Sequence, residues 1–140
     1  MVDLNDEFND ISFRLEITTD KQPQNELEPV LDADTEVLDV RAMDIFEWVD
    51  YERRFASRPD LTRIGFNNQS IILKNEHYEK IYGAPNGISF TFQQLINAIE
   101  DFSKQSRQQS NYMGGPDIYH VIFEGLYHND DGSYSINWGI

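Results

Sequence analysis

The chain of 140 residues contains no cysteine and only three histidines. Without cysteine there is no disulfide framework, no thiol nucleophile and no metal site built on thiolates. Histidine is the side chain whose ordinary pKa lies closest to neutrality, so three histidines leave few candidates for acid–base catalysis. The composition therefore excludes thiol enzymes and thiolate metalloproteins before any motif is considered.

Long apolar runs are also missing. No stretch approaches the roughly 18 consecutive apolar residues that suggest a membrane-spanning helix. The first seven residues, Met1 to Glu7, lack the basic start and the apolar run of a signal peptide. We therefore expect a cytoplasmic protein that does not bind membranes.

Basic residues are scarce. Eleven lysines and arginines stand against 25 aspartates and glutamates, which gives a net charge of −14. Such a surface repels phosphate backbones, so we do not expect direct binding to nucleic acid. Seventeen of the acidic residues lie in the first sixty positions, where the net charge is −11. The acidity is therefore concentrated in the first half of the chain.

The residues that are present suffice for one hydrophobic core. The length and a hydrophobic content of 39% predict a single domain over residues 1–140. We expect a flexible N-terminus over residues 1–10. Residues 19–36 are polar and include Pro23 and Pro29, which predicts a long acidic loop.

The first half of the chain predicts one strand and one helix. Residues 11–18 alternate apolar and polar side chains, which is the pattern of a strand with one buried face. From Ala42 to Phe55, apolar residues recur at three- and four-residue steps, with acids early and arginines late. This spacing predicts a helix over residues 40–56.

The second half predicts another helix and two hairpins. Thr91 and Gln94 fit a capping box, so a helix should begin at Phe92. The strand-like residues 64–66 and 70–73 flank three polar residues and predict a short hairpin. Residues 75–82 fit either one or two helical turns or a continued strand. Two further strand-like segments, residues 119–127 and 134–138, predict a C-terminal hairpin.

Together these elements predict an α+β domain. We expect an antiparallel sheet of about four to five strands with two main helices packed on one face of the sheet.

Catalytic and metal-binding patterns are weak. His120, Glu124 and His128 share strand parity, but residues four apart on a strand are separated by about 13 Å, so no two of these could ligate one metal ion without a further element between them. Asp32, Asp34 and Glu36 begin like a calcium loop, but the glycine and the bidentate glutamate that such a loop needs are absent. We expect no cofactor, no metal site and no enzymatic activity. A small enzyme remains an alternative if a pocket joins His120 or His128 with an acid from another element.

The most unusual feature is the mixture of acidic and aromatic residues in the predicted first helix. A solvated helix face with aromatic rings in the core would explain it. A contact surface would also explain it, because aromatic rings supply contact area and carboxylates match a basic partner. The expected partner-binding residues are Asp44, Glu47, Trp48, Asp50, Tyr51 and Glu52 in the helix, with Asp32, Asp34 and Glu36 in the loop before it.

The leading functional hypothesis is a non-catalytic acidic protein-binding domain. Carboxylates on a rigid scaffold can occupy positions where a nucleic acid would place its phosphates, and opposite charges accelerate association. The expected partner is a basic protein such as a nuclease or another nucleic-acid-binding protein, and the class includes inhibitors, immunity proteins and DNA mimics. The alternative is a structural subunit that forms a homodimer through an aromatic ladder of the C-terminal hairpin, composed of Tyr119, Tyr127, Tyr134 and Trp138.

Overall fold

The computed structural model describes residues 4–20, 37–50, 55–109 and 120–140. Within these residues the chain forms one α-helix, α1 (Phe92–Gln109), and one short 3-10 helix, η1 (Asp6–Asp10). The strands are β1 (Ile11–Asp20), β2 (Val37–Asp50), β3 (Phe55–Ser57), β4 (Ile64–Phe66), β5 (Ser70–Lys74), β6 (Glu79–Gly83), β7 (Phe90–Thr91), β8 (Ile122–His128) and β9 (Tyr134–Gly139).

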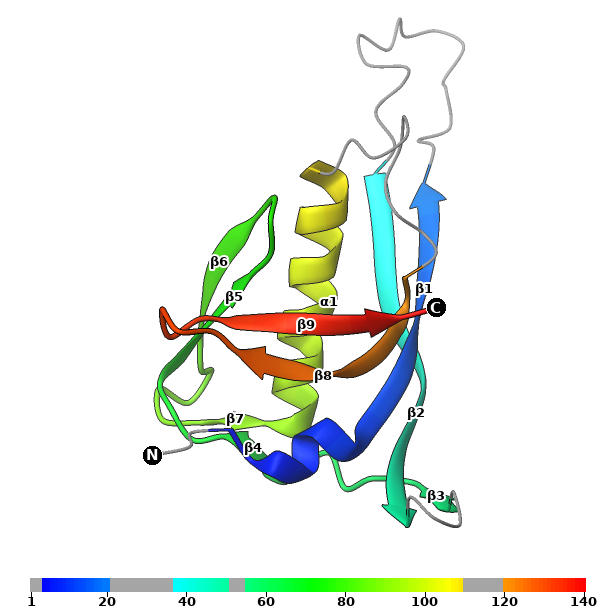
Figure 1. The fold of residues 1–140 in the computed structure, drawn as a ribbon, viewed down its shortest axis with the longest axis vertical. Coiled ribbons are helices and arrows are strands. Elements are labelled where there is room, and N and C mark those ends of the chain that lie inside the picture. The colour runs from blue at the N-terminus through cyan, green and yellow to red at the C-terminus, as the bar shows by residue number, and fades with distance from the viewer. Residues whose placement is uncertain (1–3, 21–36, 51–54, 110–119) are drawn as a thin grey trace, which may run out of the picture.

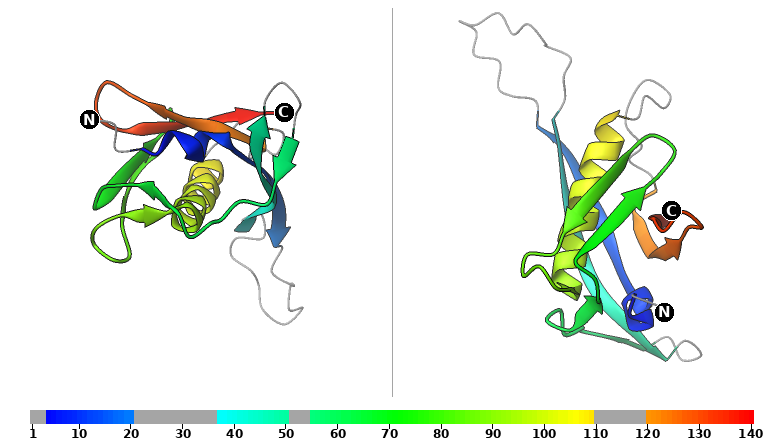
Figure 2. Two further views of the ribbon diagram at one scale, coloured as in Figure 1. Left: turned by 90° about the horizontal axis from the view of Figure 1, so that it is seen from below. Right: turned by 90° about the vertical axis from the view of Figure 1, so that its left-hand side faces the viewer.

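The strands form one large curled sheet and a small second sheet (Figure 1). The large sheet has the order β3-β2-β1-β8-β9-β5-β6, in which six longer strands form a half-barrel and the three-residue strand β3 adds one edge. The sheet is mixed, because β5 and β9 pair in parallel. Strands β4 and β7 form the small sheet. Viewed from below, Figure 2 shows strands on several sides of α1, so the sheet curls around the helix.

This architecture confirms the predicted α+β class and corrects its details. The described chain has one main helix in place of two, and the sheet is larger, mixed and strongly curled. Within the described residues, no helix is long and apolar enough to cross a membrane.

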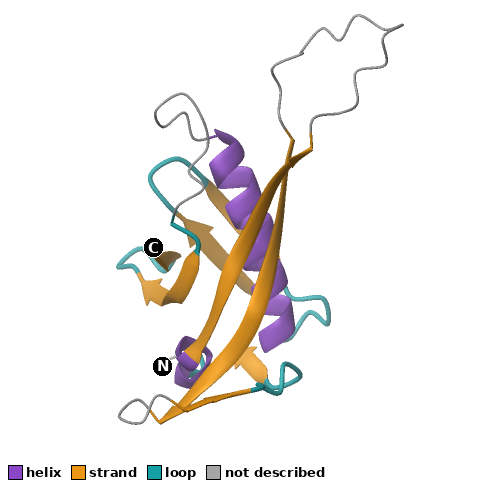
Figure 3. Ribbon diagram, turned by 90° about the vertical axis from the view of Figure 1, so that its right-hand side faces the viewer, coloured by secondary structure: helices purple, strands orange, loops and turns teal. Residues whose placement is uncertain are grey.

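Strand β1 confirms the strand predicted over residues 11–18. Ile11, Phe13 and Leu15 are buried in the core, whereas the alternate residues Arg14 and Glu16 are exposed. Strand β1 pairs with β2 over most of its length, and the two form a long twisted ribbon with α1 behind it (Figure 3). One face of this ribbon therefore belongs to the core, and the other, which we call the outer face, meets solvent.

The helix predicted over residues 40–56 is wrong, because residues 37–50 form β2. Leu38, Val40 and Ala42 follow the alternation of a strand and face inward. The register then shifts opposite Phe13, so β2 carries one extra residue at a β-bulge. The bulge places Ala42 and Ile45 three positions apart on the inner side, which imitates the spacing of a helix.

Helix α1 begins at Phe92, as predicted. The Gln94 N–H donates to Thr91 Oγ1 at 3.2 Å, and the Thr91 N–H donates to Gln94 Oε1 at 2.9 Å, which completes the capping box. Its apolar face lies inside the curled sheet, where Ile96 is 0% and Ile99 1% exposed. The helix therefore forms the centre of the core.

The hairpin predicted over residues 64–73 is wrong, whereas the C-terminal hairpin is confirmed. Strand β4 pairs with β7, and β5 pairs with β6. The three polar residues after β4 thus connect two sheets and do not form a hairpin turn. Residues 79–83 form strand β6, which returns along β5. Strands β8 and β9 pair antiparallel over most of their length.

The N-terminal residues close one end of the core. Leu4 bridges to Phe66, and Phe8 in η1 is fully buried, with its ring edge-on to those of Phe92 and Phe123. The sequence predicts flexibility up to residue 10, whereas residues 4–10 pack against the domain. Strand β1 continues to Asp20, so the first two residues of the acidic loop predicted over residues 19–36 belong to this strand. The remaining residues, 21–36, lie outside the described residues.

Candidate partner-binding groove

The candidate site lies where β1 and β8 separate. The two strands share one ladder pair, Arg14 with Ile122. Beyond it, side chains replace the backbone ladder, because the Ser12 hydroxyl donates to the Phe123 carbonyl at 3.1 Å. The Asn9 amide oxygen accepts a hydrogen bond from the Leu126 N–H at 2.9 Å. These bonds join β1 and η1 to β8 beyond the ladder pair, beside a groove that all three elements line.

Two β-bulges place carboxylates at this groove. Asp44 stands at the bulge of β2 with a backbone φ of 55°, a left-handed conformation that is uncommon outside glycine. Glu124 is the extra residue of a bulge in β8, next to Gly125, whose φ is 130°. Bulges redirect side chains and are frequent beside functional sites. Both carboxylates therefore lie where a regular ladder would not have placed them.

The groove has a volume of about 480 Å³ and combines aromatic, acidic and basic groups. Phe46 and Trp48 on the outer face of β2 form an edge-to-face pair with ring centroids 4.9 Å apart. Both rings are half-buried, so part of each remains open to solvent. The side chains or backbone of Asn9, Ile11, Ser12, Phe13, Arg14, Asp44, Phe46, Trp48, Ile122 and Glu124 line the groove.

The charges of the groove are only partly compensated. Arg14 lies 3.7 Å from Asp44, and both side chains are largely exposed, so this ion pair is weak. Glu124 forms no ion pair with any described residue. Its carboxylate lies over Gly139, where an added Cβ would collide with Oε1 of Glu124. A second hollow of about 420 Å³ shares Asn9 and Glu124 with the groove, which extends the concave surface across β8 and β9.

The structure brings together two of the predicted partner-binding residues. Asp44 and Trp48 both line the groove. Glu47 does not, because strand alternation places it on the opposite side of β2, next to Arg63. Tyr51, Glu52, Asp32, Asp34 and Glu36 lie outside the described residues, as does the side chain of Asp50. Over residues 44–50, a strand takes the place of the expected helical face.

Glu47 belongs to a structural cluster. Arg63 donates to Glu47 and to Glu7, each at 2.8 Å, and its guanidinium lies 4.4 Å from the ring centroid of Phe92. The Glu47 side chain is only 17% exposed, whereas that of Glu7 is 59% exposed. The cluster ties β2 and η1 to the loop before β4.

Glu47→Gln is expected to lower the free energy of unfolding by about 2 kcal/mol, because it weakens a charge-assisted hydrogen bond in a shielded position. Glu7→Gln is the matched control, since Glu7 contacts the same guanidinium from an exposed position and should cost about 0.5 kcal/mol or less. Urea denaturation of both variants makes the comparison. Equal losses would contradict the structural role given to Glu47.

The left-handed backbone at Asp44 leads to a second prediction. Asp44→Gly should keep or raise stability, because glycine adopts this conformation without strain. Asp44→Val should cost about 1–2 kcal/mol, since a β-branched side chain is disfavoured there. Both variants remove the same carboxylate, so thermal and urea denaturation isolate the effect of the backbone. Similar stabilities for the two variants would show that the bulge is not as described.

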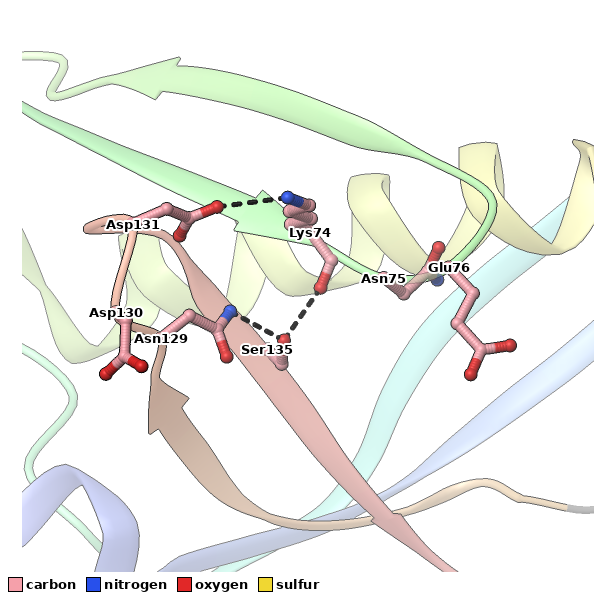
Figure 4. Close-up of a pocket in the computed structure, with 7 residues that line it drawn as sticks. All are labelled: Lys74, Asn75, Glu76, Asn129, Asp130, Asp131 and Ser135. Carbon is pink, nitrogen blue, oxygen red and sulfur yellow. Dashed lines mark hydrogen bonds and ion pairs between the residues drawn. The ribbon is translucent and has the colours of Figure 1, made fainter.

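A further hollow lies between the β5–β6 turn and the β8–β9 turn (Figure 4). Ser133 donates through its N–H and hydroxyl to Asp131, and Lys74 also donates to this carboxylate, so the pKa of Asp131 lies well below its usual range. Asp131 in turn raises the pKa of Lys74. These bonds fix the two turns and account for the polar residues there. The neighbouring Asp130 is exposed and serves below as a control position.

The histidines do not gather into a catalytic site. His120 and His77 are exposed, and the ring of His128 stacks on that of Tyr134 with centroids 4.6 Å apart. Among the described residues, no group of three or more histidines and carboxylates could hold a metal ion.

Several groove residues were not predicted from the sequence. Phe46, Glu124, Ser12 and Asn9 are not among the residues that the sequence predicts to bind a partner. The sequence contains one signal of the bulge in β8, namely Gly125, which interrupts a strand-like run. An isolated glycine in a strand often marks a bulge. This glycine stands beside the bulge that carries Glu124.

Comparison of the chain with protein-family models, with curated proteins and with solved structures found no match. The fold and the groove define the protein as an α+β domain with a groove of mixed aromatic and acidic lining on the outer face of its sheet.

Proposed function

We propose that the protein is a non-catalytic acidic binding domain that docks on a basic partner protein through the groove of its outer face. The observation that carries the proposal is the pairing of a half-buried aromatic wall, Phe46 and Trp48, with bulge-placed carboxylates at Asp44 and Glu124. Aromatic side chains are the commonest anchors of protein interfaces. Carboxylates beside them favour a partner of opposite charge.

The charge of the whole chain supports the same proposal. A net charge of −14 on 140 residues produces a strong negative field that steers basic partners toward the protein and repels nucleic acid. Basic protein surfaces commonly serve to bind nucleic acid. We therefore propose a nuclease or another nucleic-acid-binding protein as the partner, and an inhibitor, an immunity protein or a DNA mimic as the role of this chain.

The outer face of the sheet is suited to docking. An antiparallel sheet can leave one face in solvent, but polar residues are then expected on that face. Here Met43, Phe46 and Trp48 of β2 lie on it, as does Ile122 of β8, with β1 between the two strands. Clustered apolar groups on a solvent-facing surface are typical of interaction sites.

Two described members of the aromatic ladder of the hairpin-assembly alternative face or pack against the core. Tyr134 is only 5% exposed, and Trp138 packs edge-on to Phe13 and Phe123 in the core. Tyr127, at 68% exposure, is the described member that is open to solvent. Tyr119 lies outside the described residues.

The test is capture of partners from the native host, followed by competition. The captured protein should have a basic surface, and a short DNA or RNA duplex that it binds should be displaced by this protein. Binding should persist in the Asp130→Asn variant and fall in the Asp44→Asn, Glu124→Gln double variant. A captured partner that is acidic, or that binds duplex and this protein at once, would overturn the proposal in its present form.

A further inference from the structure

The protein already contains one site that holds a guanidinium group, that of its own Arg63, between an aromatic ring and carboxylates. Arg63 is held by a ring face at 4.4 Å and by two carboxylates, each at 2.8 Å. The ring belongs to Phe92, and the carboxylates to Glu7 and Glu47. A planar cation is thus recognised from its face by an aromatic ring and from its edge by carboxylates.

The groove presents the same kinds of groups on the outer face. Phe46 and Trp48 supply the rings, and Asp44 and Glu124 supply the carboxylates. Arg14 lies beside Asp44, so one carboxylate already has a cationic neighbour. Among the described residues, no cation lies over the rings of Phe46 or Trp48, and none is paired with Glu124. Within the described part of the chain, one aromatic wall and one carboxylate therefore remain available.

We propose that the groove receives one arginine side chain of the partner, with Glu124 as its counter-charge and Trp48 as its stacking surface. The inference rests on the proposed function and specifies the group that is recognised. Arginine fits better than lysine, because a planar guanidinium can stack on an indole and donate two parallel hydrogen bonds to one carboxylate. The net negative charge of the chain selects for a cation.

The carboxylate of Glu124 lies at the β9 side of the groove, across β1 and β8 from Trp48. The bulge in β8 takes Glu124 out of the ladder, and its side chain extends across Gly139 on β9. A glycine at position 139 leaves the room that the carboxylate occupies. Gly139→Ala is therefore a second way to disturb the site. The new methyl group must displace the end of the Glu124 side chain, but the negative charge of Glu124 is retained.

The test uses the purified full chain and an acetylated, amidated Gly-Arg-Gly tripeptide. The chain has two tryptophans, Trp48 and Trp138, so their indole N–H signals in an NMR titration report on the groove and on the core separately. The Trp48 signal should shift with arginine, less with a lysine tripeptide and not with a citrulline tripeptide. The Trp138 signal should remain in place.

Variants decide which groups bind. Glu124→Gln should weaken the arginine tripeptide about tenfold, as expected for the loss of one charge-assisted hydrogen bond. Gly139→Ala should weaken it as well, with an unchanged circular dichroism spectrum, and Asp130→Asn should bind like the parent. An equal response to arginine and citrulline, or an unchanged affinity in Glu124→Gln, would overturn the arginine site.

Failure of this inference can be told apart from failure of the proposed function. If the captured basic partner binds at the outer face but the tripeptide does not shift Trp48, the arginine site is wrong and the docking function stands. If the tripeptide binds as described but no basic partner uses the outer face, the site stands and the docking function is wrong.

Discussion

Replacement of Ile99 by glutamate is expected to unfold the domain at ordinary temperatures. Ile99 lies on the buried side of α1 and is 1% exposed. A carboxylate at this position would be buried among apolar side chains without a paired cation. Burying an unpaired charge destabilises a fold several times more than the loss of a buried methylene group. The expected loss is about 4 kcal/mol or more, which is a large part of the stability of a small domain. Circular dichroism and urea denaturation measure it.

Gln93→Glu is the matched control on the same helix. Gln93 is exposed in the first turn of α1, where a negative charge is favoured by the helix dipole. It should keep the stability of the parent. An Ile99→Glu variant that melts like the parent would contradict the placement of α1 at the centre of the curled sheet.

Trp48→Ala is expected to have the largest effect on binding. Truncation of a central aromatic anchor typically costs about 2 kcal/mol or more, which is about thirtyfold in Kd. The change should act mainly on the dissociation rate, because the indole supplies contact area and not long-range attraction. Surface plasmon resonance with the captured partner separates the two rate constants.

The control for this change is Ile81→Ala. Ile81 is 63% exposed on β6, at the opposite edge of the large sheet from β2 and β3. It should leave both rate constants unchanged. Equal losses of affinity in the two variants would show that the partner does not use the groove.

The elements with strong local signals could be predicted from the sequence. The capping box of Thr91 and Gln94 marks the start of α1, and it is formed by neighbouring residues alone. The alternation over residues 11–18 likewise requires no knowledge of distant partners. Both predictions are confirmed.

The error at β2 arose from bulges. A bulge changes the spacing of inward-facing residues from two to three, and three-residue spacing is also the spacing of a helix. Only the pairing with β1 distinguishes the two structures. The short hairpin failed for a related reason, because partner choice among β4, β5, β6 and β7 depends on contacts far apart in the sequence.

The groove was predicted in part and for the wrong geometric reason. The helix predicted over residues 40–56 would bring Asp44 and Trp48 together one turn apart, whereas strand alternation and the bulge do so in the structure. The other carboxylate, Glu124, lies eighty residues away in sequence. No local pattern links it to Trp48, since their proximity depends on the order of β2, β1 and β8 in the sheet.

The central claim is that a negatively charged groove on the outer face meets a basic partner. The most direct measurement is the association rate constant with that partner as a function of ionic strength, for the parent, for Glu124→Lys and for Asp130→Lys. The claim predicts a parent rate that falls steeply with salt, a slower and flatter profile for Glu124→Lys, and a much smaller change for Asp130→Lys. A parent rate independent of salt, or equal profiles for the two lysine variants, would contradict it.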